Sequence, residues 1–258
     1  MDTSSLILSL FLILPLFVAG WWIQERQQDA GWVDVLWAFC VAAVAVFYVT
    51  VGKGDLSLRL LTGAIYLLWF GRLGLHLTIR LLESEEEDGR YARMRQWAGK
   101  KSSVVFLGFY LMQASWVWIF TLPAWLLAAG RWPPLWCVSA ALLVVVVSWW
   151  GESVADAQLL DFKRNPSNQQ QVCRQGLWRY SRHPNYFFEW CHWFCYPLLG
   201  IASYGGGWLW AAPLVMFIFL YFVTGIPFSE QQALSRRGEA YRHYQQTTSM
   251  FIPWKPKT

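Results

Sequence analysis

Residues 176–190 read Gly176-Leu-Trp-Arg-Tyr-Ser-Arg-His-Pro-Asn-Tyr-Phe-Phe-Glu-Trp190. The first half of this stretch carries Arg179, Arg182 and His183, and the second half is apolar apart from Asn185 and Glu189. A charged or polar side chain within a bilayer costs roughly 2–3 kcal/mol, so such residues usually face a protein interior or a water-filled cavity. A basic entrance followed by buried polar groups therefore favours an anionic cofactor whose reactive end enters the membrane.

The composition predicts a membrane protein. The chain has 258 residues, of which 56% are hydrophobic and only 14% charged, and its apolar runs reach the roughly 20 residues that a bilayer-spanning helix needs. The seven expected spans are residues 5–23, 31–51, 57–80, 103–128, 134–153, 185–203 and 206–226. No long polar linker interrupts them, so we expect an all-α polytopic bundle that forms one integral membrane domain over residues 1–258.

The basic residues predict the orientation of this bundle. Seventeen of the 21 lysines and arginines fall in alternate loops and in the C-terminal tail. The positive-inside rule then gives an outside N-terminus and a cytoplasmic C-terminus. The tail at 228–244 is expected to form an amphipathic helix at the membrane interface, with residues 251–254 packing back onto the domain. Because the cations lie in loops at the membrane edge, nucleic acid is not an expected partner.

The cysteines do not indicate a disulfide framework or a metal site. Four of the five lie in expected spans, where a cysteine behaves as a small apolar residue. Cys191, His192 and Cys195 are close in sequence, but a second pair of ligands is missing, so no metal is expected.

Polar residues within the expected spans group by helical spacing. Arg72 and His76 lie four residues apart on one helix face, and Asp34 lies in the first turn of the second span. Such residues either shape a site or neutralise one another between helices. Arg72 could form such a neutralising pair with Asp34 or with Glu189. Both interpretations, a site and a structural ion pair, stay open.

The longer motif has a recognisable family pattern. Gly176-Leu-Trp-x-x-x-Arg-His-Pro-Asn-Tyr-x-x-Glu189, followed by Phe-x-Tyr-Pro-Leu, resembles the C-terminal signature of steroid 5-alpha-reductase-like membrane proteins. It is most similar to their bacterial DUF1295 branch. The other similar segments are 33–37, 72–76, 87–91, 235–244 and 251–254. The resemblance thus covers nearly the whole chain, with the signature region at about 103–258. Isoprenylcysteine carboxyl methyltransferases share only Arg-His-Pro-x-Tyr.

This resemblance implies a seven-helix bundle with NADPH between the later helices and the cytoplasmic loops. Asn185 matches the asparagine that holds the nicotinamide carboxamide. The other matching cofactor positions are Asp156, Lys163, Tyr186 and Glu189. Four more residues are candidates for binding the phosphates of NADPH, because they are basic and lie in or near the expected cytoplasmic loops: Arg179, Arg182, His183 and Arg237.

The chain also departs from the steroid reductases. Their last cytoplasmic segment offers an arginine, a histidine and a tyrosine to the cofactor, where this chain has Ile226, Glu230 and Leu234. Their carbonyl-polarising tyrosine corresponds to about Trp69, which is not an acid. The candidate catalytic residues are therefore Tyr66 or His76 as the donor, Asp34 in place of the family's glutamate, and Arg72 near the substrate. At the position of Phe188, both the steroid reductases and the methyltransferases have a glycine. The larger phenylalanine side chain is expected to narrow the binding pocket.

The expected function is NADPH-dependent reduction of an activated C=C bond in a lipid or steroid-like substrate. The alternatives are an S-adenosylmethionine-dependent membrane methyltransferase and a non-catalytic lipid-binding membrane protein. The expected surroundings are the lipid bilayer of a bacterial inner membrane, or of the endoplasmic reticulum in a eukaryote. The sequence does not predict the oligomeric state.

Overall fold

The fold is helical. The computed structural model describes residues 3–84, 86–168 and 170–257, and these residues contain no strand. They belong to two compact units: unit 1 comprises Met1–Pro133 and Ala202–Gly206, and unit 2 comprises Pro134–Ile201 and Gly207–Thr258.

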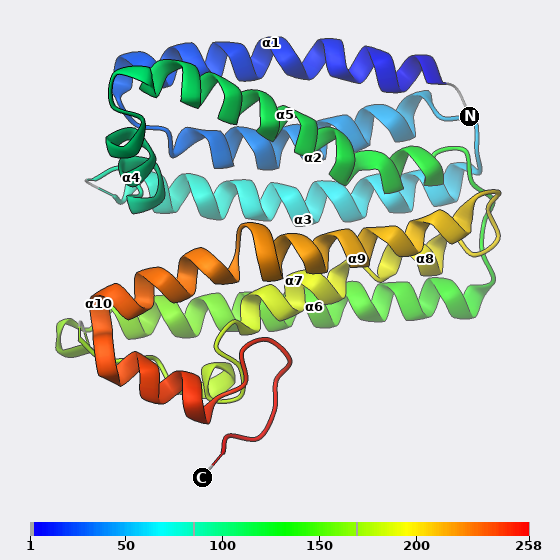
Figure 1. The fold of residues 1–258 in the computed structure, drawn as a ribbon. Helices are drawn as coiled ribbons and strands as arrows, with labels where there is room; N and C mark the ends of the chain where they lie inside the picture. Colours follow the sequence, from blue (N-terminus) through cyan, green and yellow to red (C-terminus); the bar gives the residue numbers. More distant parts are fainter. Residues whose placement is uncertain (1–2, 85, 169, 258) are drawn as a thin grey trace. The chain divides into compact units, whose positions relative to one another are not determined.

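Unit 1 is a bundle of four long helices with one short helix at its end. Its helices are α1 (Thr3–Gln27), α2 (Trp32–Val51), α3 (Leu56–Leu82), α4 (Gly89–Ala98) and α5 (Ser102–Leu127). Helix α2 contacts α1, α3 and α5, so it lies at the centre of the unit (Figure 1). Tyr48 and Tyr66 are fully buried there, with the Tyr48 hydroxyl 2.6 Å from Ser9 Oγ. Asp55 caps α3 by accepting a hydrogen bond from the Leu58 amide at 3.1 Å.

Unit 2 is built around one long helix. Its α-helices are α6 (Leu135–Arg164), α7 (Pro184–His192), α8 (Cys195–Leu199), α9 (Ala211–Ile218) and α10 (Ile226–Thr247). A π-helical segment, Phe219–Val223, follows α9, and a 3-10 turn, Gly176–Arg179, precedes α7. Asn185 contacts Asp156, and three residues later Phe188 packs on Gly151. Helices α7 and α8 therefore run antiparallel to α6 and contact it in turn (Figure 1).

Apolar helices of spanning length confirm the membrane prediction. By length and composition, six segments of the described residues qualify, namely Thr3–Gln27, Trp32–Val51, Leu56–Leu82, Gly89–Leu127, Leu135–Arg164 and Gly206–Thr247. They match six of the seven expected spans to within one residue at the ends that fall outside a helix. Their large apolar side chains are often exposed, as at Phe11, which fits a lipid-facing surface. The chain is therefore an integral membrane protein.

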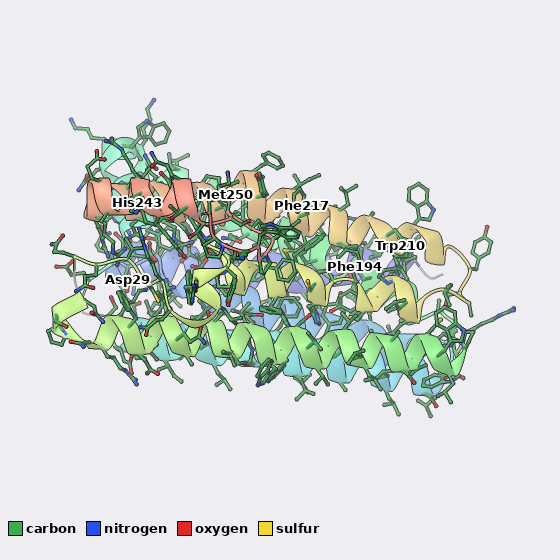
Figure 2. All side chains as sticks on the ribbon, turned by 90° about the horizontal axis from the view of Figure 1, so that it is seen from below. Asp29, Phe194, Trp210, Phe217, His243 and Met250 are labelled. Carbon is green, nitrogen blue, oxygen red and sulfur yellow. The ribbon has the colours of Figure 1, made fainter. Side chains whose placement is uncertain are left out.

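The expected span at 185–203 is not one helix. It forms α7 and α8, which are separated at Trp193 and Phe194. Phe194 lies 6.2 Å from the Trp210 ring, centroid to centroid, so aromatic packing surrounds the break (Figure 2). Hydropathy averages over a window and does not register such an interruption.

The C-terminal segment is helical, as expected at 228–244, but it is not straight. Within α10 the backbone leaves the helical region at Gly238, where φ is 47° and ψ is −122°. Helix α10 therefore consists of two arms joined at an angle (Figure 1). The chain then packs back, as expected for 251–254: the Trp254 amide donates to the Tyr180 carbonyl at 2.9 Å.

Candidate functional site

A strip of polar side chains lines the contact between α6 and α7. Asn185 Nδ2 donates to Asp156 Oδ1 at 3.2 Å, and Asn185 Oδ1 accepts from the Tyr186 amide at 3.0 Å. One turn further, Glu189 Oε1 accepts from the Trp193 indole at 3.0 Å. Glu152 is buried on α6, one turn from Asp156. The structure thus brings together Asn185 and Asp156, two of the expected cofactor residues.

Two local features bring α6 and α7 close together. Pro184 occupies the first turn of α7, where its missing N–H costs nothing and its fixed φ suits the helix. Gly151 on α6 has no side chain, and a Cβ there would collide with the ring of Phe188. Phe188, expected to narrow a pocket, instead fills the notch at Gly151.

His183 lies at the entrance to α7. Its Nε2 is 2.9 Å from Glu230 Oε1, and its ring stacks on Tyr186 with centroids 5.5 Å apart and planes 9° apart. The Tyr186 hydroxyl lies 3.1 Å from Ser229 Oγ. Burial lowers the pKa of His183, although the hydrogen bond and the charge of Glu230 oppose this shift. The imidazole is therefore neutral at pH 7.

Glu230 is the centre of a buried polar cluster. It accepts hydrogen bonds from Arg182 Nε at 2.9 Å and from the Tyr241 hydroxyl at 2.7 Å, and Gln245 donates to it as well. Arg182 is only 8% exposed, and its Nη1 donates to the Gln245 and Thr248 carbonyls, both at 2.9 Å. The Arg182 guanidinium therefore hydrogen-bonds to both arms of α10 and links them to each other. This geometry does not favour the phosphate-binding role expected for Arg182 and His183.

The other expected phosphate ligands lie at the surface of unit 2. Lys163 and Arg179 are exposed. Arg237 is half-buried, and its Nε donates to the Gln171 carbonyl at 2.6 Å.

Asp34 is fixed within unit 1. Its Oδ2 accepts from Arg90 Nη2 and its Oδ1 from the Tyr91 hydroxyl, each at 2.8 Å. Burial favours a higher pKa for the neighbouring Asp88, but hydrogen bonds and the charge of Arg90, with the charge of Arg80, outweigh burial and lower it. These contacts join the first turn of α4 to the first turn of α2.

The other candidate catalytic residues lie on α3. Tyr66 is buried, and its hydroxyl donates to the Phe120 carbonyl at 2.9 Å, which does not favour it as the proton donor. Arg72 is half-buried, with its guanidinium carbon 5.4 Å from the Trp69 ring centroid, and His76 is exposed.

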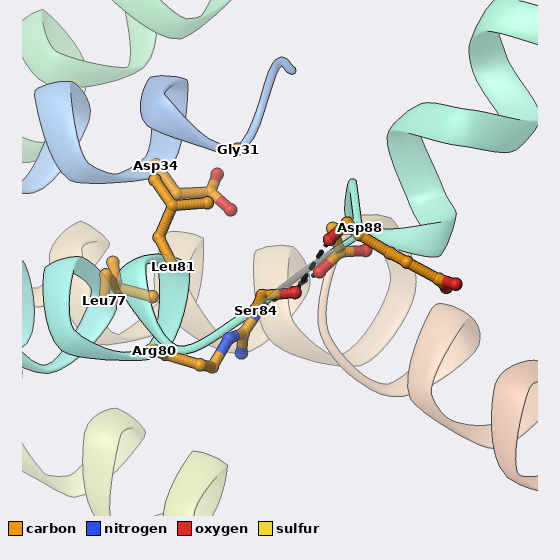
Figure 3. Close-up of a pocket in the computed structure, with 8 residues that line it drawn as sticks. Gly31, Asp34, Leu77, Arg80, Leu81, Ser84 and Asp88 are labelled. Carbon is orange, nitrogen blue, oxygen red and sulfur yellow. Dashed lines mark hydrogen bonds and ion pairs between the residues drawn. The ribbon is translucent and has the colours of Figure 1, made fainter. Parts of the chain in front are cut away.

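Unit 1 also contains a small polar pocket at one end of α2 and α3 (Figure 3). Its lining residues are Gly31, Asp34, Leu77, Arg80, Leu81, Ser84, Glu86 and Asp88. Its volume is about 100 Å³, room for roughly three waters and too little for a dinucleotide.

Sequence reasoning missed the cluster around Glu230, although a signal was present. Residues 162–188 contain five cations and no acid. A buried charge needs a partner, so an acid from elsewhere in the chain had to reach this segment. Glu230 was noted only as a departure from the family pattern.

The fold and the polar strip define an integral membrane protein with a candidate site in unit 2. A family described as "Protein of unknown function (DUF1295)" matches residues 20–248. The chain belongs to this family, as its motifs predict. No curated protein and no solved structure matches the chain.

Proposed function

We propose that this protein is a membrane-embedded, NADPH-dependent reductase of an activated C=C bond in a lipid or steroid-like substrate. The observation that carries this proposal is the hydrogen bond between Asn185 Nδ2 and Asp156 Oδ1, which fixes the orientation of the Asn185 carboxamide. The relation to steroid 5-alpha-reductases belongs to the proposal, because it rests on the motif at 176–189.

The Asn185 carboxamide is chemically suited to a nicotinamide. An asparagine has two N–H donors and one carbonyl acceptor with two lone pairs. One donor is used by Asp156, and the Tyr186 amide uses one lone pair. The remaining donor and lone pair are complementary to the carboxamide of a nicotinamide. S-adenosylmethionine has no carboxamide to match them.

The charges of unit 2 support the same assignment. Arg182 and His183 interact with Glu230, so the phosphates are assigned to Lys163, Arg179 and Arg237. Tyr186 and Glu189 complete the nicotinamide side of the site.

A reduced nicotinamide supplies a hydride to the β carbon of a conjugated carbonyl. The protein positions the substrate, excludes water and stabilises the charge that develops on the carbonyl oxygen. Arg72 and His76 can each donate a hydrogen bond to such an oxygen.

The proposal includes seven crossings, an outside N-terminus and a cytoplasmic C-terminus, in a bacterial inner membrane or the endoplasmic reticulum of a eukaryote. The antiparallel run of α7 and α8 beside α6 supports a crossing at 185–203 despite its break. The cation-rich segments at 80–102, 154–184 and the C-terminal tail support the orientation.

Ligand binding to the detergent-purified protein tests the function. NADPH, NADH and S-adenosylmethionine are titrated separately against the wild type, Asn185→Ala and Asn165→Ala. Asn165 lies in an exposed turn and is the matched control. We expect NADPH to bind, and Asn185→Ala to weaken binding about tenfold, the weight of one or two hydrogen bonds.

A methyltransferase is the second candidate, favoured by the shared Arg-His-Pro-x-Tyr at 182–186. Binding of S-adenosylmethionine alone would establish it in place of the reductase. Binding of none of the three ligands would favour a non-catalytic membrane protein over both enzymes.

A further inference from the structure

The C-terminal segment Ser249–Lys257 is held firmly against unit 2. The Arg182 amide donates to the Ser249 carbonyl at 2.9 Å, and Ser181 Oγ donates to the Phe251 carbonyl at 2.8 Å. The Lys257 amide donates to the Thr247 carbonyl at 2.8 Å. These hydrogen bonds are spread along the segment and fix the path of its backbone. The backbone in turn determines on which side of the segment each side chain lies.

One side chain of the segment anchors it beside apolar helices. Phe251 is buried, and its ring centroid lies 5.9 Å from that of Phe187 on α7 and 5.6 Å from that of Phe217 on α9. The segment therefore lies against helices α7 and α9, one of which belongs to a spanning candidate. Phe187 lies near the start of the expected span at 185–203, so we place the segment near the membrane interface.

Other apolar side chains near Phe251 are exposed. Ile252 is 56% exposed and Trp254 is 73% exposed. Tyr180, whose carbonyl accepts from the Trp254 amide, is exposed as well. Fixed exposed aromatic and aliphatic side chains are unfavourable in water, whereas tryptophan and tyrosine are enriched where lipid meets water.

The only charged side chains within residues 249–257 are those of two lysines. Lys255 and Lys257 are exposed beside the apolar side chains. The two chain segments that meet here, residues 162–188 and 240–258, contain no aspartate or glutamate. Lysines on the cytoplasmic side are attracted to anionic lipids, and each is worth about a fivefold change in affinity.

We propose that Tyr180, Ile252, Trp254, Lys255 and Lys257 form an interfacial anchor that binds the headgroups of anionic phospholipids. Ile252 and Trp254 enter the boundary between headgroups and acyl chains, and the two lysines contact the lipid phosphates. This assignment does not depend on the proposed reductase activity.

Lipid retention tests the anchor. The full chain is reconstituted in vesicles of phosphatidylcholine and phosphatidylglycerol, extracted gently, and its bound lipids are counted by native mass spectrometry. We expect the wild type to retain phosphatidylglycerol preferentially. The double variant Lys255→Gln/Lys257→Gln is expected to lower this preference by an order of magnitude or more, at about fivefold per lysine. Trp254→Ala is expected to lower the retention of both lipids.

The matched control is Lys53→Gln/Arg131→Gln, which removes the same charge from exposed positions of unit 1. It is expected to keep the wild-type preference. An unchanged preference in the Lys255/Lys257 variant would overturn the proposal, and so would an equal loss in the control. A wild type that retains neither lipid would overturn the proposal as well.

Discussion

The single residue Glu230 links several separate segments of unit 2 through hydrogen bonds to its carboxylate. Four side chains donate to its carboxylate: Arg182, His183, Tyr241 and Gln245. They come from the entrance to α7 and from the second arm of α10, so one carboxylate joins segments that are distant in sequence. A buried ion pair that loses one partner costs far more than an exposed pair, because the other charge is left without compensation.

Glu230→Gln is therefore expected to lower the free energy of unfolding by about 3 kcal/mol. Glu239→Gln is the matched control, because Glu239 also pairs with an arginine of α10, Arg242, but is 83% exposed. Its expected effect is below about 0.5 kcal/mol. Unfolding in mixed micelles with increasing sodium dodecyl sulfate measures both variants. Equal effects would show that the Glu230 cluster does not stabilise unit 2.

His183 predicts a dependence of stability on pH. Burial lowers its pKa in the folded protein below the ordinary value of 6.5. Below about pH 6.5 the unfolded chain therefore binds a proton more readily than the folded one, and stability is lost as the pH falls. The unfolding midpoint is expected to decrease from pH 7.5 to pH 5.5.

The variant His183→Gln keeps a donor near Glu230 but does not titrate. It is expected to show a smaller decrease than the wild type over the same range, measured in the same micelles. A decrease of equal size would assign the pH dependence to other groups.

At this scale the sequence predicted some contacts and missed others. Asn185 and Asp156 were expected in one site, because the family resemblance assigns both to the cofactor, and the structure brings them together. The assignment of Arg182 to phosphate rests on its charge and its place in the sequence. Its partner, Glu230, lies 48 residues away, and no local pattern connects the two.

A single glycine, Gly238, produces the bend in helix α10. Gly238 has φ of 47°, a conformation that strains any residue with a Cβ. Its position between Glu230 and Tyr241 allows the two arms of α10 to meet at one carboxylate.

Gly238→Ala is expected to destabilise the protein by about 1 kcal/mol. Gly108→Ala is the control, since Gly108 lies within α5, where a Cβ would meet no atom within 4 Å. There the same substitution is expected to stabilise the protein by up to about 1 kcal/mol. Thermal unfolding in detergent measures both, and effects of the same sign would contradict the role assigned to the bend.

The elements themselves were largely predictable from the sequence. Apolar runs located α1, α2, α3, α5 and α6, because length and hydropathy determine a spanning helix. The break between α7 and α8 and the bend in α10 depend on contacts made after folding. Hydropathy therefore predicted where these segments lie but not their shape.

The number of crossings determines the topology of the whole molecule. With seven crossings the two termini lie on opposite sides of the membrane, whereas with six they lie on the same side. A reporter active only in the cytoplasm, fused after Thr258, is expected to be active. The same reporter fused before Met1 is expected to be inactive. Equal activity of the two fusions would show that residues 185–203 do not cross.

The contacts of Arg182 also bear on how the chain is made. Every acceptor of its guanidinium follows it in sequence, by 48 residues for Glu230 and by 66 for the Thr248 carbonyl. During synthesis Arg182 therefore leaves the ribosome well before any of these partners exists. A chain that stops within α10 between Glu230 and Gln245 keeps the carboxylate but lacks the two carbonyls that accept from Arg182 Nη1, which leaves a buried donor without its partners and is unfavourable. The last two turns of α10 thus distinguish a finished chain from a truncated one, and quality-control proteases are expected to remove the latter.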